Sequence, residues 1–388
     1  MSKRKPNGTG SISPYKDGWR GQYYDPEIKK QRSVYGKTYP ECQKRLNEKL
    51  GSIEAGAYVP PDKMLTGAWL DFWFENIYTI STRLSTQGAT ASGIRLHLKP
   101  AIGKYPLQRL KTDHVQMMIR DLQQKGLSPV TIERLLNTLS QAMKQAVKMK
   151  KISYNPVDGV NRPKKEKPEI KFLNAEEQAA LLRNLPDSTH GRAIQFILRT
   201  GVRVSEACGL KWKDIQEDGI HIERLNQTIK DWRQDKLVNI ETLPKTSAGR
   251  RIIPATATLR AILNEQMKNQ KEECLQMGRP FDGVNGYVFA TVVGTPADRN
   301  NISRTLRSVC KAAGIESRGI HALRHTFATD WTQMNPDMVS LSKIIGHTDP
   351  AFTYRVYCHA DSASMMRGMD MIERILQNAT ECNDAARR

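Results

Sequence analysis

The sequence predicts a multidomain α+β protein: a small N-terminal domain made of a three-stranded sheet and one helix, an all-α middle domain, and a mixed, mainly α C-terminal domain with a small β-sheet. Its 388 residues are enough for two or three domains, each with its own core. The hydrophobic pattern changes after the proline pair in residues 58–61 and again after a charged, proline-containing stretch at residues 161–171. We therefore expect domains at residues 1–57, 64–160 and 172–388, with residues 161–171 as a linker.

The strong positive charge indicates a polyanionic partner. The chain has 60 Lys and Arg against 40 Asp and Glu, a formal net charge of +20, and a pI of about 9.7. Nucleic acid is favoured over a membrane surface because no basic amphipathic helix lies beside a lipidation signal. No run approaches the ~20 apolar residues of an ordinary membrane span. Charge alone leaves a generic basic protein open as the alternative.

The use of cysteine indicates a reducing compartment. The six cysteines are scattered and no C-x-x-C pair occurs, so we expect free thiols. The basic N-terminus is followed by no apolar run, and no signal peptide is visible. These features predict a cytoplasmic protein.

Short β-rich runs in residues 10–39, interrupted by turn residues, predict the three N-terminal strands, and residues 40–56 predict the helix. Two- and three-stranded β elements fit into a DNA groove, so polar residues of these strands are candidate DNA contacts. They are Arg20, Gln22, Tyr24 and Arg32. The alternative for this surface is that its aromatic side chains only cover the helix.

The middle domain shows helical periodicity over residues 65–155. Trp69, Phe72, Trp73 and Ile77 recur at three- and four-residue steps, which predicts the apolar face of a helix. Basic residues of this domain are candidates for neutralising phosphates, with a solvated charged face as the alternative. They are Lys99, Lys104, Arg109 and Lys111.

The C-terminal domain mixes helices with short strands. Asn174 is the expected cap of its first helix. Short β runs at residues 220–230 and 250–255 flank Lys245, which we therefore expect in or near a hairpin turn. Residues 361–377 carry apolar side chains at helical spacing and predict an amphipathic helix.

Six residues of this domain form a set suited to attack on a phosphodiester. Tyr357 is the candidate nucleophile, but a phenol with an ordinary pKa near ~10 needs a proton acceptor and cationic neighbours. Guanidinium groups match phosphate oxygens bidentately. His321 and Arg324 are three residues apart, so they share one helix face. The full set is Arg203, Lys245, His321, Arg324, His347 and Tyr357.

In their order and spacing these residues resemble the tyrosine recombinase, or phage integrase, family. The similarity is strongest over residues 172–360, where four separate motifs occur in order. By this resemblance Arg203 matches the first catalytic Arg, Lys245 the hairpin Lys, His321 and Arg324 the His-x-x-Arg pair, His347 the second His, and Tyr357 the nucleophile. Glu206 would orient Arg203 or a neighbour and would not itself react. The family spacing, ten residues after the second His, selects Tyr357 and leaves Tyr354 as a packing residue.

The resemblance implies a site-specific recombinase that cuts and rejoins DNA through a 3′-phosphotyrosyl link and so integrates and excises a mobile element, such as a conjugative transposon or a temperate phage. Lys245 would protonate the leaving 5′ oxygen, and His321 would accept or relay the proton of the tyrosine. The bond energy is stored in the adduct, so no cofactor, metal or ATP is required.

The family also implies roles for the domains and the partners. The first domain resembles an arm-site-binding domain and the second a core-binding domain, which leaves catalysis to the third. The tail helix would dock on a neighbouring protomer, or pack on its own domain. The expected partners are double-stranded DNA at core and arm sites and three further copies of the chain in a tetramer on DNA, with an excisionase and DNA-bending proteins as candidate accessory partners. The expected setting is the bacterial cytoplasm, at the nucleoid when bound.

Alternatives remain for the function of the protein and for the roles of individual residues. The small N-terminal sheet domain argues against a type IB topoisomerase. The complete set of six residues argues against a DNA-binding regulator without catalysis. The arm-binding domain argues against a chromosome-dimer recombinase. A metal site formed by His347, Cys358 and His359 fits no common zinc spacing. His325 follows Arg324 directly and points about 100° away from it, so we expect it in the core or in a structural hydrogen bond.

Overall fold

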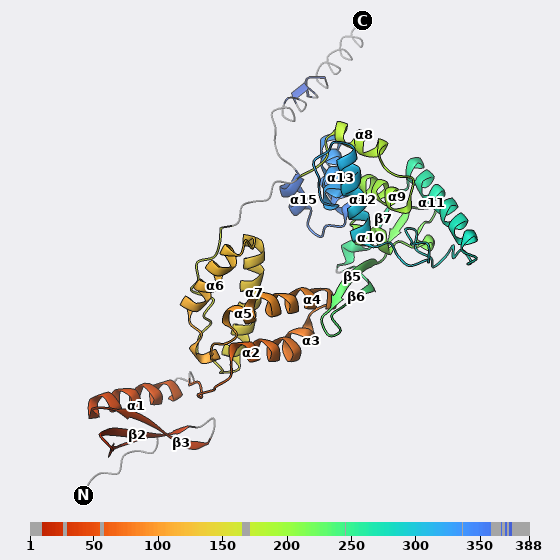
Figure 1. Cartoon of the computed structure of the whole chain (residues 1–388). Coiled ribbons are helices and arrows are strands. Elements are labelled where there is room, and N and C mark those ends of the chain that lie inside the picture. Colours follow the sequence, from red (N-terminus) through yellow and green to blue (C-terminus); the bar gives the residue numbers. More distant parts are fainter. Residues whose placement is uncertain are drawn as a thin grey trace. The chain divides into compact units, whose positions relative to one another are not determined.

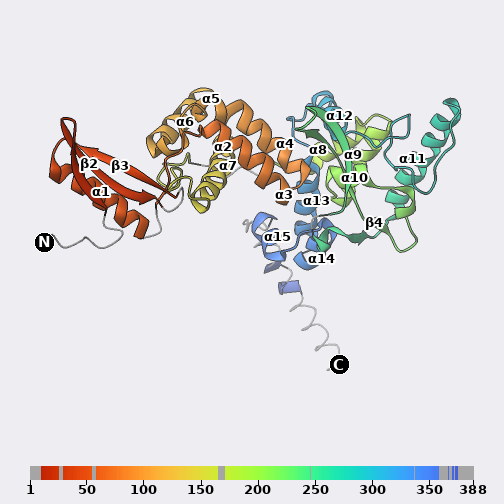
Figure 2. The same cartoon turned by 90° about the horizontal axis from the view of Figure 1, so that it is seen from below.

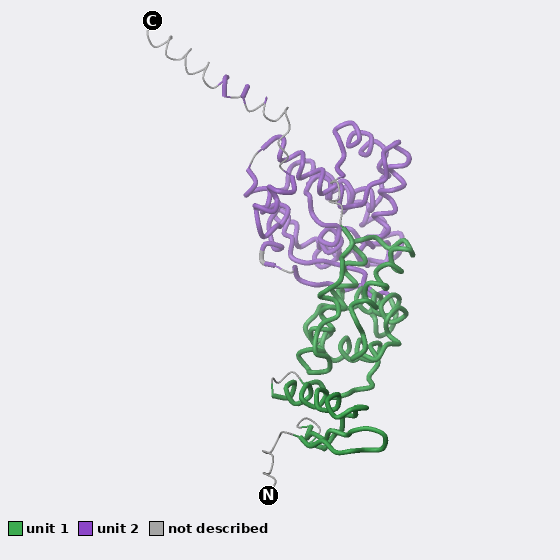
Figure 3. Tube along the Cα trace, turned by 90° about the vertical axis from the view of Figure 1, so that its left-hand side faces the viewer, with its two compact units in different colours: residues 1–167, 230–236 green, residues 168–229, 237–388 purple. Residues whose placement is uncertain are grey.

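The computed structural model describes residues 10–25, 29–54, 58–164, 171–244, 246–335, 337–357, 366, 369–370 and 372–374. Contacts within the chain define two units, Met1–Lys167 with Lys230–Lys236, and Pro168–Ile229 with Leu237–Arg388 (Figure 3). The boundary after Lys167 falls within the predicted linker. The predicted fold class is confirmed, with one small three-stranded sheet at the N-terminus and mainly helices beyond it (Figure 1).

Unit 1 begins with the predicted sheet and helix. Strands β1 (Ser11–Tyr15), β2 (Gly18–Asp25) and β3 (Lys30–Gly36) pair antiparallel in the order β1-β2-β3, and α1 (Tyr39–Glu54) packs on one face (Figure 2). Gly36 permits the close approach of the helix, because a Cβ at this position would lie 2.6 Å from the backbone nitrogen of Cys42. Tyr23 and Leu46 are buried between sheet and helix.

The two faces of this sheet separate the candidate DNA contacts. Side chains alternate along a strand, so Arg20, Gln22 and Tyr24 lie on the face opposite to the buried Tyr23. Arg32 is paired with Tyr23 in the β2–β3 register and therefore shares its face, where it lies 3.7 Å from the carboxylate of Asp25. Arg20, Gln22 and Tyr24 can thus contact the same DNA, whereas Arg32 lies on the face that carries α1.

The helical part of unit 1 forms a second core. Its elements are α2 (Thr66–Trp73), the π-helical turn Phe74–Tyr78, α3 (Thr79–Ser81), α4 (Leu84–Gly93), the π-helical turn Ile94–Leu98, α5 (Lys99–Ile102), α6 (Thr112–Gln124) and α7 (Pro129–Lys148). Trp69 is fully buried and donates its indole N–H to Ala142 O of α7 at 3.0 Å. The four candidate basic residues, Lys99, Lys104, Arg109 and Lys111, are all exposed.

Residues Lys230–Lys236 belong to the contact network of unit 1, which the sequence did not indicate. Trp232 packs edge-on against Phe74 with ring centroids 4.9 Å apart, and its indole N–H donates to Gln87 Oε1 at 2.9 Å. The close approach explains Gly88, since a Cβ there would lie 2.4 Å from the carbonyl oxygen of Lys230.

Unit 2 is mainly helical with two short two-stranded sheets. Its helices are α8 (Ala175–Arg183), α9 (Thr189–Thr200), α10 (Val204–Gly209), α11 (Ala257–Gln276), α12 (Arg299–Ala312), α13 (His321–Met334), α14 (Met338–Ile345) and α15 (Pro350–Tyr357). Its strands are β4 (Ile220–Ile222), β5 (Leu225–Asp231), β6 (Lys236–Thr242) and β7 (Arg251–Ile253), paired β4-β7 and β5-β6. Helix α9 is central and contacts α10, α11, α12 and α13. The predicted cap of α8 is confirmed, because Asn174 Oδ1 accepts from Glu177 N at 2.8 Å.

The predicted tail helix over residues 361–377 lies mostly outside the described residues. Of that segment, Met366, Met369, Asp370 and residues 372–374 are described, and they are helical. Along the described ranges, no helix has the length and apolar character needed to cross a bilayer.

Candidate active site

Arg203 is positioned by a sharp turn between two helices. Helix α9 ends at Thr200 and is capped by Gly201, whose φ of 65° is left-handed, and Arg203 is the residue that precedes α10. A Cβ at Gly201 would also lie 2.5 Å from the ring of Phe327. Glycine is therefore required here by both backbone and packing, and it directs Arg203 away from α9.

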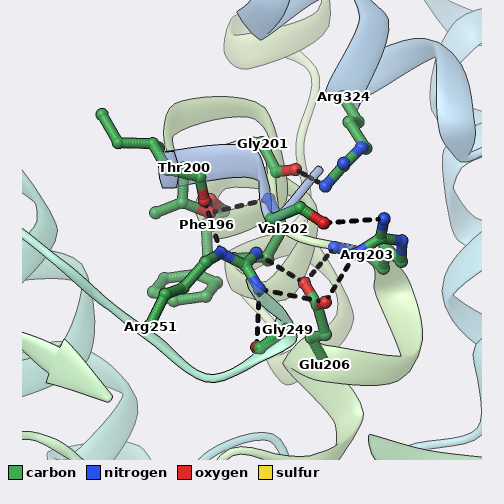
Figure 4. Close-up of polar contacts among 11 residues, drawn as sticks. Phe196, Thr200, Gly201, Val202, Arg203, Glu206, Gly249, Arg251 and Arg324 are labelled. Carbon is green, nitrogen blue, oxygen red and sulfur yellow. Dashed lines mark hydrogen bonds and ion pairs between the residues drawn. The ribbon is translucent and has the colours of Figure 1, made fainter. Parts of the chain in front are cut away.

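The carboxylate of Glu206 orients two arginines (Figure 4). Glu206 is 1% exposed and accepts from the backbone N–H of Arg203 at 2.8 Å and from Arg203 Nη1 at 2.9 Å. Arg251 Nη2 and Nη1 donate to the same carboxylate at 2.8 and 3.1 Å. Burial alone would raise the pKa of Glu206, but the hydrogen bonds and charge of Arg251, and then those of Arg203, hold it below its ordinary value.

The contact expected between Glu206 and Arg203 is therefore present, and Arg251 is a participant that the sequence did not single out. Arg251 also donates to Ile344 O of α14, and so connects α10, β7 and α14. The only sequence signal was its place in the basic run after Lys245. Lys245 itself lies outside the described residues.

Arg324 has one guanidinium nitrogen available for a ligand. It is 5% exposed, and its Nη1 donates to Gly201 O at 2.7 Å (Figure 4). Its Nη2 is buried and has no hydrogen-bond partner among the described residues. Burial, followed by the charge of Arg203, lowers the pKa of Arg324 to about 10, so the group is still a cation at pH 7. An anionic oxygen would satisfy this nitrogen.

His347 is oriented by the helix that carries the candidate nucleophile. It follows Gly346, the left-handed cap of α14, and its Nδ1 lies 2.9 Å from Oγ1 of the buried Thr353. Ser342 donates its hydroxyl to the same Thr353 oxygen at 2.8 Å. The Thr353 proton is then free for Nδ1, which leaves Nε2 as the protonated nitrogen of His347. Burial, then Arg324 and Arg203, lower the pKa of His347 to about 4, so its ring is neutral at pH 7.

Tyr357 ends α15 and is 7% exposed, whereas Tyr354 is 60% exposed. The prediction that Tyr354 is a packing residue is therefore wrong, because α15 turns that position to solvent. The Tyr357 hydroxyl lies 2.9 Å from His325 Nδ1. His325 is half-buried and makes a hydrogen bond, as expected, but its partner is the candidate nucleophile: α15 approaches α13 on the side of His325, which no local pattern indicates.

His321 opens α13 and is exposed. Its pKa is lowered, first by partial desolvation and then by the neighbouring charges of Arg299, Arg324 and Arg203. Among the described residues it makes no hydrogen bond to Tyr357, whose hydroxyl is taken by His325.

A cavity of about 650 Å³ opens beside these groups. Its lining includes Arg203, Glu206, Thr246 and His347, together with Gly346, whose carbonyl accepts from Arg203 Nη2 at 3.3 Å. The cavity is lined by the guanidinium group of Arg203, which suits the oxygens of a phosphodiester. In the part of the chain that the structure describes, no three His, Cys, Asp or Glu side chains are grouped to hold a metal ion.

Two family models match the chain. The phage integrase family model matches residues 171–364, and the model of the phage integrase N-terminal SAM-like domain matches residues 67–123. The chain therefore belongs to the phage integrase family, and it is a site-specific recombinase of the tyrosine type. This confirms the family expected from the spacing of the six residues.

The chain is similar to a relative in sequence and to two solved structures in fold. The tyrosine recombinase XerC-like protein of Caldanaerobacter subterraneus subsp. tengcongensis is 28% identical over 346 residues, which cover 84% of this chain and 88% of that protein. The Tn1549 transposon integrase, solved in complex with a circular intermediate DNA, superposes with a TM-score of 0.67 at 22% identity and covers 80% of this chain and 99% of that one. A lambda integrase tetramer bound to a Holliday junction gives a TM-score of 0.57 at 18% identity, covering 92% and 97%.

Proposed function

We propose that this recombinase is the integrase of a mobile element, and that it cuts and rejoins DNA through a covalent 3′-phosphotyrosyl intermediate. The observation that carries the proposal is the unpartnered, buried Nη2 of Arg324 next to Arg203, with the Tyr357 phenol held nearby at the end of α15. Two guanidinium groups close enough to act on the charge of one phenol suit a phosphodiester and a nucleophile.

In this mechanism the oxygen of Tyr357 attacks phosphorus and the bridging 5′ oxygen departs. Arg203, Arg324 and His347 stabilise the charge on the non-bridging oxygens of the pentavalent phosphorus, where loss of one such contact typically costs on the order of 10² in rate or more. Lys245 protonates the leaving oxygen. The free 5′ hydroxyl of the same or a partner strand later attacks the phosphotyrosyl link.

Three features support the finer parts of the proposal. The relatives include an integrase of a transposon, which favours a mobile element as the host. The outer face of the β1-β2-β3 sheet bears Arg20, Gln22 and Tyr24, as a second DNA-binding domain would require. The lambda integrase tetramer on a Holliday junction favours four copies of this chain on DNA during strand exchange. An excisionase and DNA-bending proteins remain candidate partners.

Covalent trapping tests the proposal directly. The protein is incubated with a library of nicked duplexes of random sequence. After cleavage, the short fragment that carries the free 5′ hydroxyl diffuses away, and adducts are recovered after denaturation. We expect DNA attached to the peptide that carries Tyr357. Tyr357→Phe should bind DNA and form no adduct, while Tyr354→Phe is the matched control and should behave as the wild type.

Other outcomes would redirect the assignment. DNA attached to Tyr354 would overturn the choice of nucleophile, and absence of any adduct would favour a DNA-binding regulator. Relaxation of supercoiled DNA without exchange between two sites that carry the recovered sequence would favour a type IB topoisomerase.

A further inference from the structure

His325 makes the one hydrogen bond that reaches the nucleophilic oxygen among the described residues. Its Nδ1 lies 2.9 Å from Tyr357 Oη, within the range of a direct hydrogen bond, and the two ring planes are tilted by 48° with centroids 5.7 Å apart. His325 is half-buried on α13, one residue after Arg324. The same turn of helix therefore provides both the arginine that would bind the phosphate, Arg324, and the hydrogen-bond partner of the phenol, His325.

The proton in this contact belongs to the tyrosine. Burial raises the pKa of Tyr357 above its ordinary value, even though Arg324 and Arg203 act in the opposite direction, so the phenol is protonated at pH 7. Burial, then His321 and Arg324, lower the pKa of His325, so its imidazole is neutral. A neutral imidazole nitrogen facing a phenol O–H accepts its hydrogen bond.

The other two histidines of the candidate set make no hydrogen bond to the phenol among the described residues. His347 Nδ1 is held by Thr353 Oγ1 at 2.9 Å, and His321 is exposed at the first turn of α13. The charged and titratable groups around the contact are His321 and Arg324 from α13, Tyr357 from α15, His347 from the segment between α14 and α15, and Arg203 from the turn before α10.

We infer that His325 is a further catalytic residue, the general base that removes the proton of Tyr357 during cleavage and returns it during rejoining. The inference rests on the proposed phosphotyrosyl mechanism. As the bond between Tyr357 Oη and phosphorus forms, the O–H proton moves to His325 Nδ1, while the bridging 5′ oxygen leaves with its electron pair and takes a proton from a separate acid. In rejoining, a 5′ hydroxyl forms its bond to phosphorus and gives its proton back to the conjugate base of that acid, while the phosphorus–Oη bond breaks and the imidazolium returns its proton to the phenolate oxygen.

Chemical rescue separates proton transfer from structural support. His325→Ala should bind DNA like the wild type and form the adduct more slowly by about 10²–10⁴-fold, the usual contribution of a positioned acid or base. Imidazole added to the solution should restore adduct formation. The restored rate should follow the concentration of neutral imidazole as pH changes, and should rise with more basic substituted imidazoles.

His325→Asn is the matched control variant, since its amide oxygen can hold the hydroxyl near the position of Nδ1 but cannot take up its proton. We expect it to be as slow as the alanine variant and insensitive to imidazole. A normal rate in His325→Asn would reduce His325 to a positioning residue, and faster cleavage in both variants would mean that the contact restrains the nucleophile. Either result would overturn the inference.

The wild-type protein distinguishes this inference from the proposed function. If the wild type forms an adduct on Tyr357 and His325→Ala does so equally fast without imidazole, only the role of His325 is refuted. If the wild type forms no adduct, the phosphotyrosyl mechanism itself fails.

Discussion

Replacing Glu206 with Gln should weaken unit 2 far more than a single polar change usually does. The buried carboxylate accepts four hydrogen bonds, two from Arg203 and two from Arg251. An amide turns one acceptor oxygen into a donor that faces other donors, and it removes the negative charge between two guanidinium groups. Breaking a buried ion pair from one side costs about 3–5 kcal/mol, and we expect a loss of this size in the free energy of unfolding.

Urea unfolding of the full chain, followed with a probe in unit 2, measures this loss. Glu223→Gln is the matched control, because the side chain of Glu223 is 40% exposed, against 1% for Glu206, and lies 3.7 Å from Arg250. Such pairs contribute about 0–1 kcal/mol. If Glu206→Gln were no more destabilising than Glu223→Gln, the carboxylate would not be holding the two arginines together.

The same site predicts a pH dependence. The folded-state pKa of Glu206 lies below its ordinary value of 4.5, so its contribution to stability is complete above pH 4.5 and is lost as the pH falls through the folded-state value. Wild-type stability should fall more steeply below pH 4.5 than that of Glu206→Gln. Parallel curves for the two proteins would contradict the assigned direction of the shift.

Three further predictions concern Thr353, Gly201 and the N-terminal sheet. Thr353→Val keeps the shape of the side chain but leaves Nδ1 of His347 without its hydrogen bond. Loss of such a bond costs about 1–3 kcal/mol, so adduct formation should slow by roughly 10- to 100-fold while DNA binding is unchanged. Unaltered cleavage kinetics would show that His347 does not depend on Thr353. Gly201→Ala should destabilise unit 2 by about 2 kcal/mol or more in thermal unfolding, since φ is 65° and the added Cβ meets an aromatic ring; a full-stability variant would be the contrary result. Arg20→Ala should weaken DNA binding and reduce its salt dependence by about one counterion, while Arg32→Ala, on the α1 face, should leave the salt slope unchanged. Equal effects of the two changes in a binding titration would exclude the outer face as the specific contact.

Local patterns were sufficient for much of the architecture. The cap at Asn174, the spacing between Arg203 and Glu206, and the shared helix face of His321 and Arg324 follow from rules that act within one or two turns of helix. The β-rich runs and turn residues of residues 10–39 similarly predict the sheet, and residues 40–56 predict the helix. Each of these features depends on neighbours that are close in sequence.

What the sequence determined by itself is the order of the elements, the family, and the set of residues from which a phosphodiester site can be assembled. Tertiary structure alone decided that Arg251 shares the carboxylate of Glu206, that Thr353 orients His347, and that His325 holds the hydroxyl of Tyr357. The physical reason is that helical periodicity specifies which side chains share a face of one helix, whereas the packing of α10, α13, α14 and α15 specifies which faces meet. A hydrogen bond between residues 32 positions apart is a property of that packing, and no spacing along the chain encodes it.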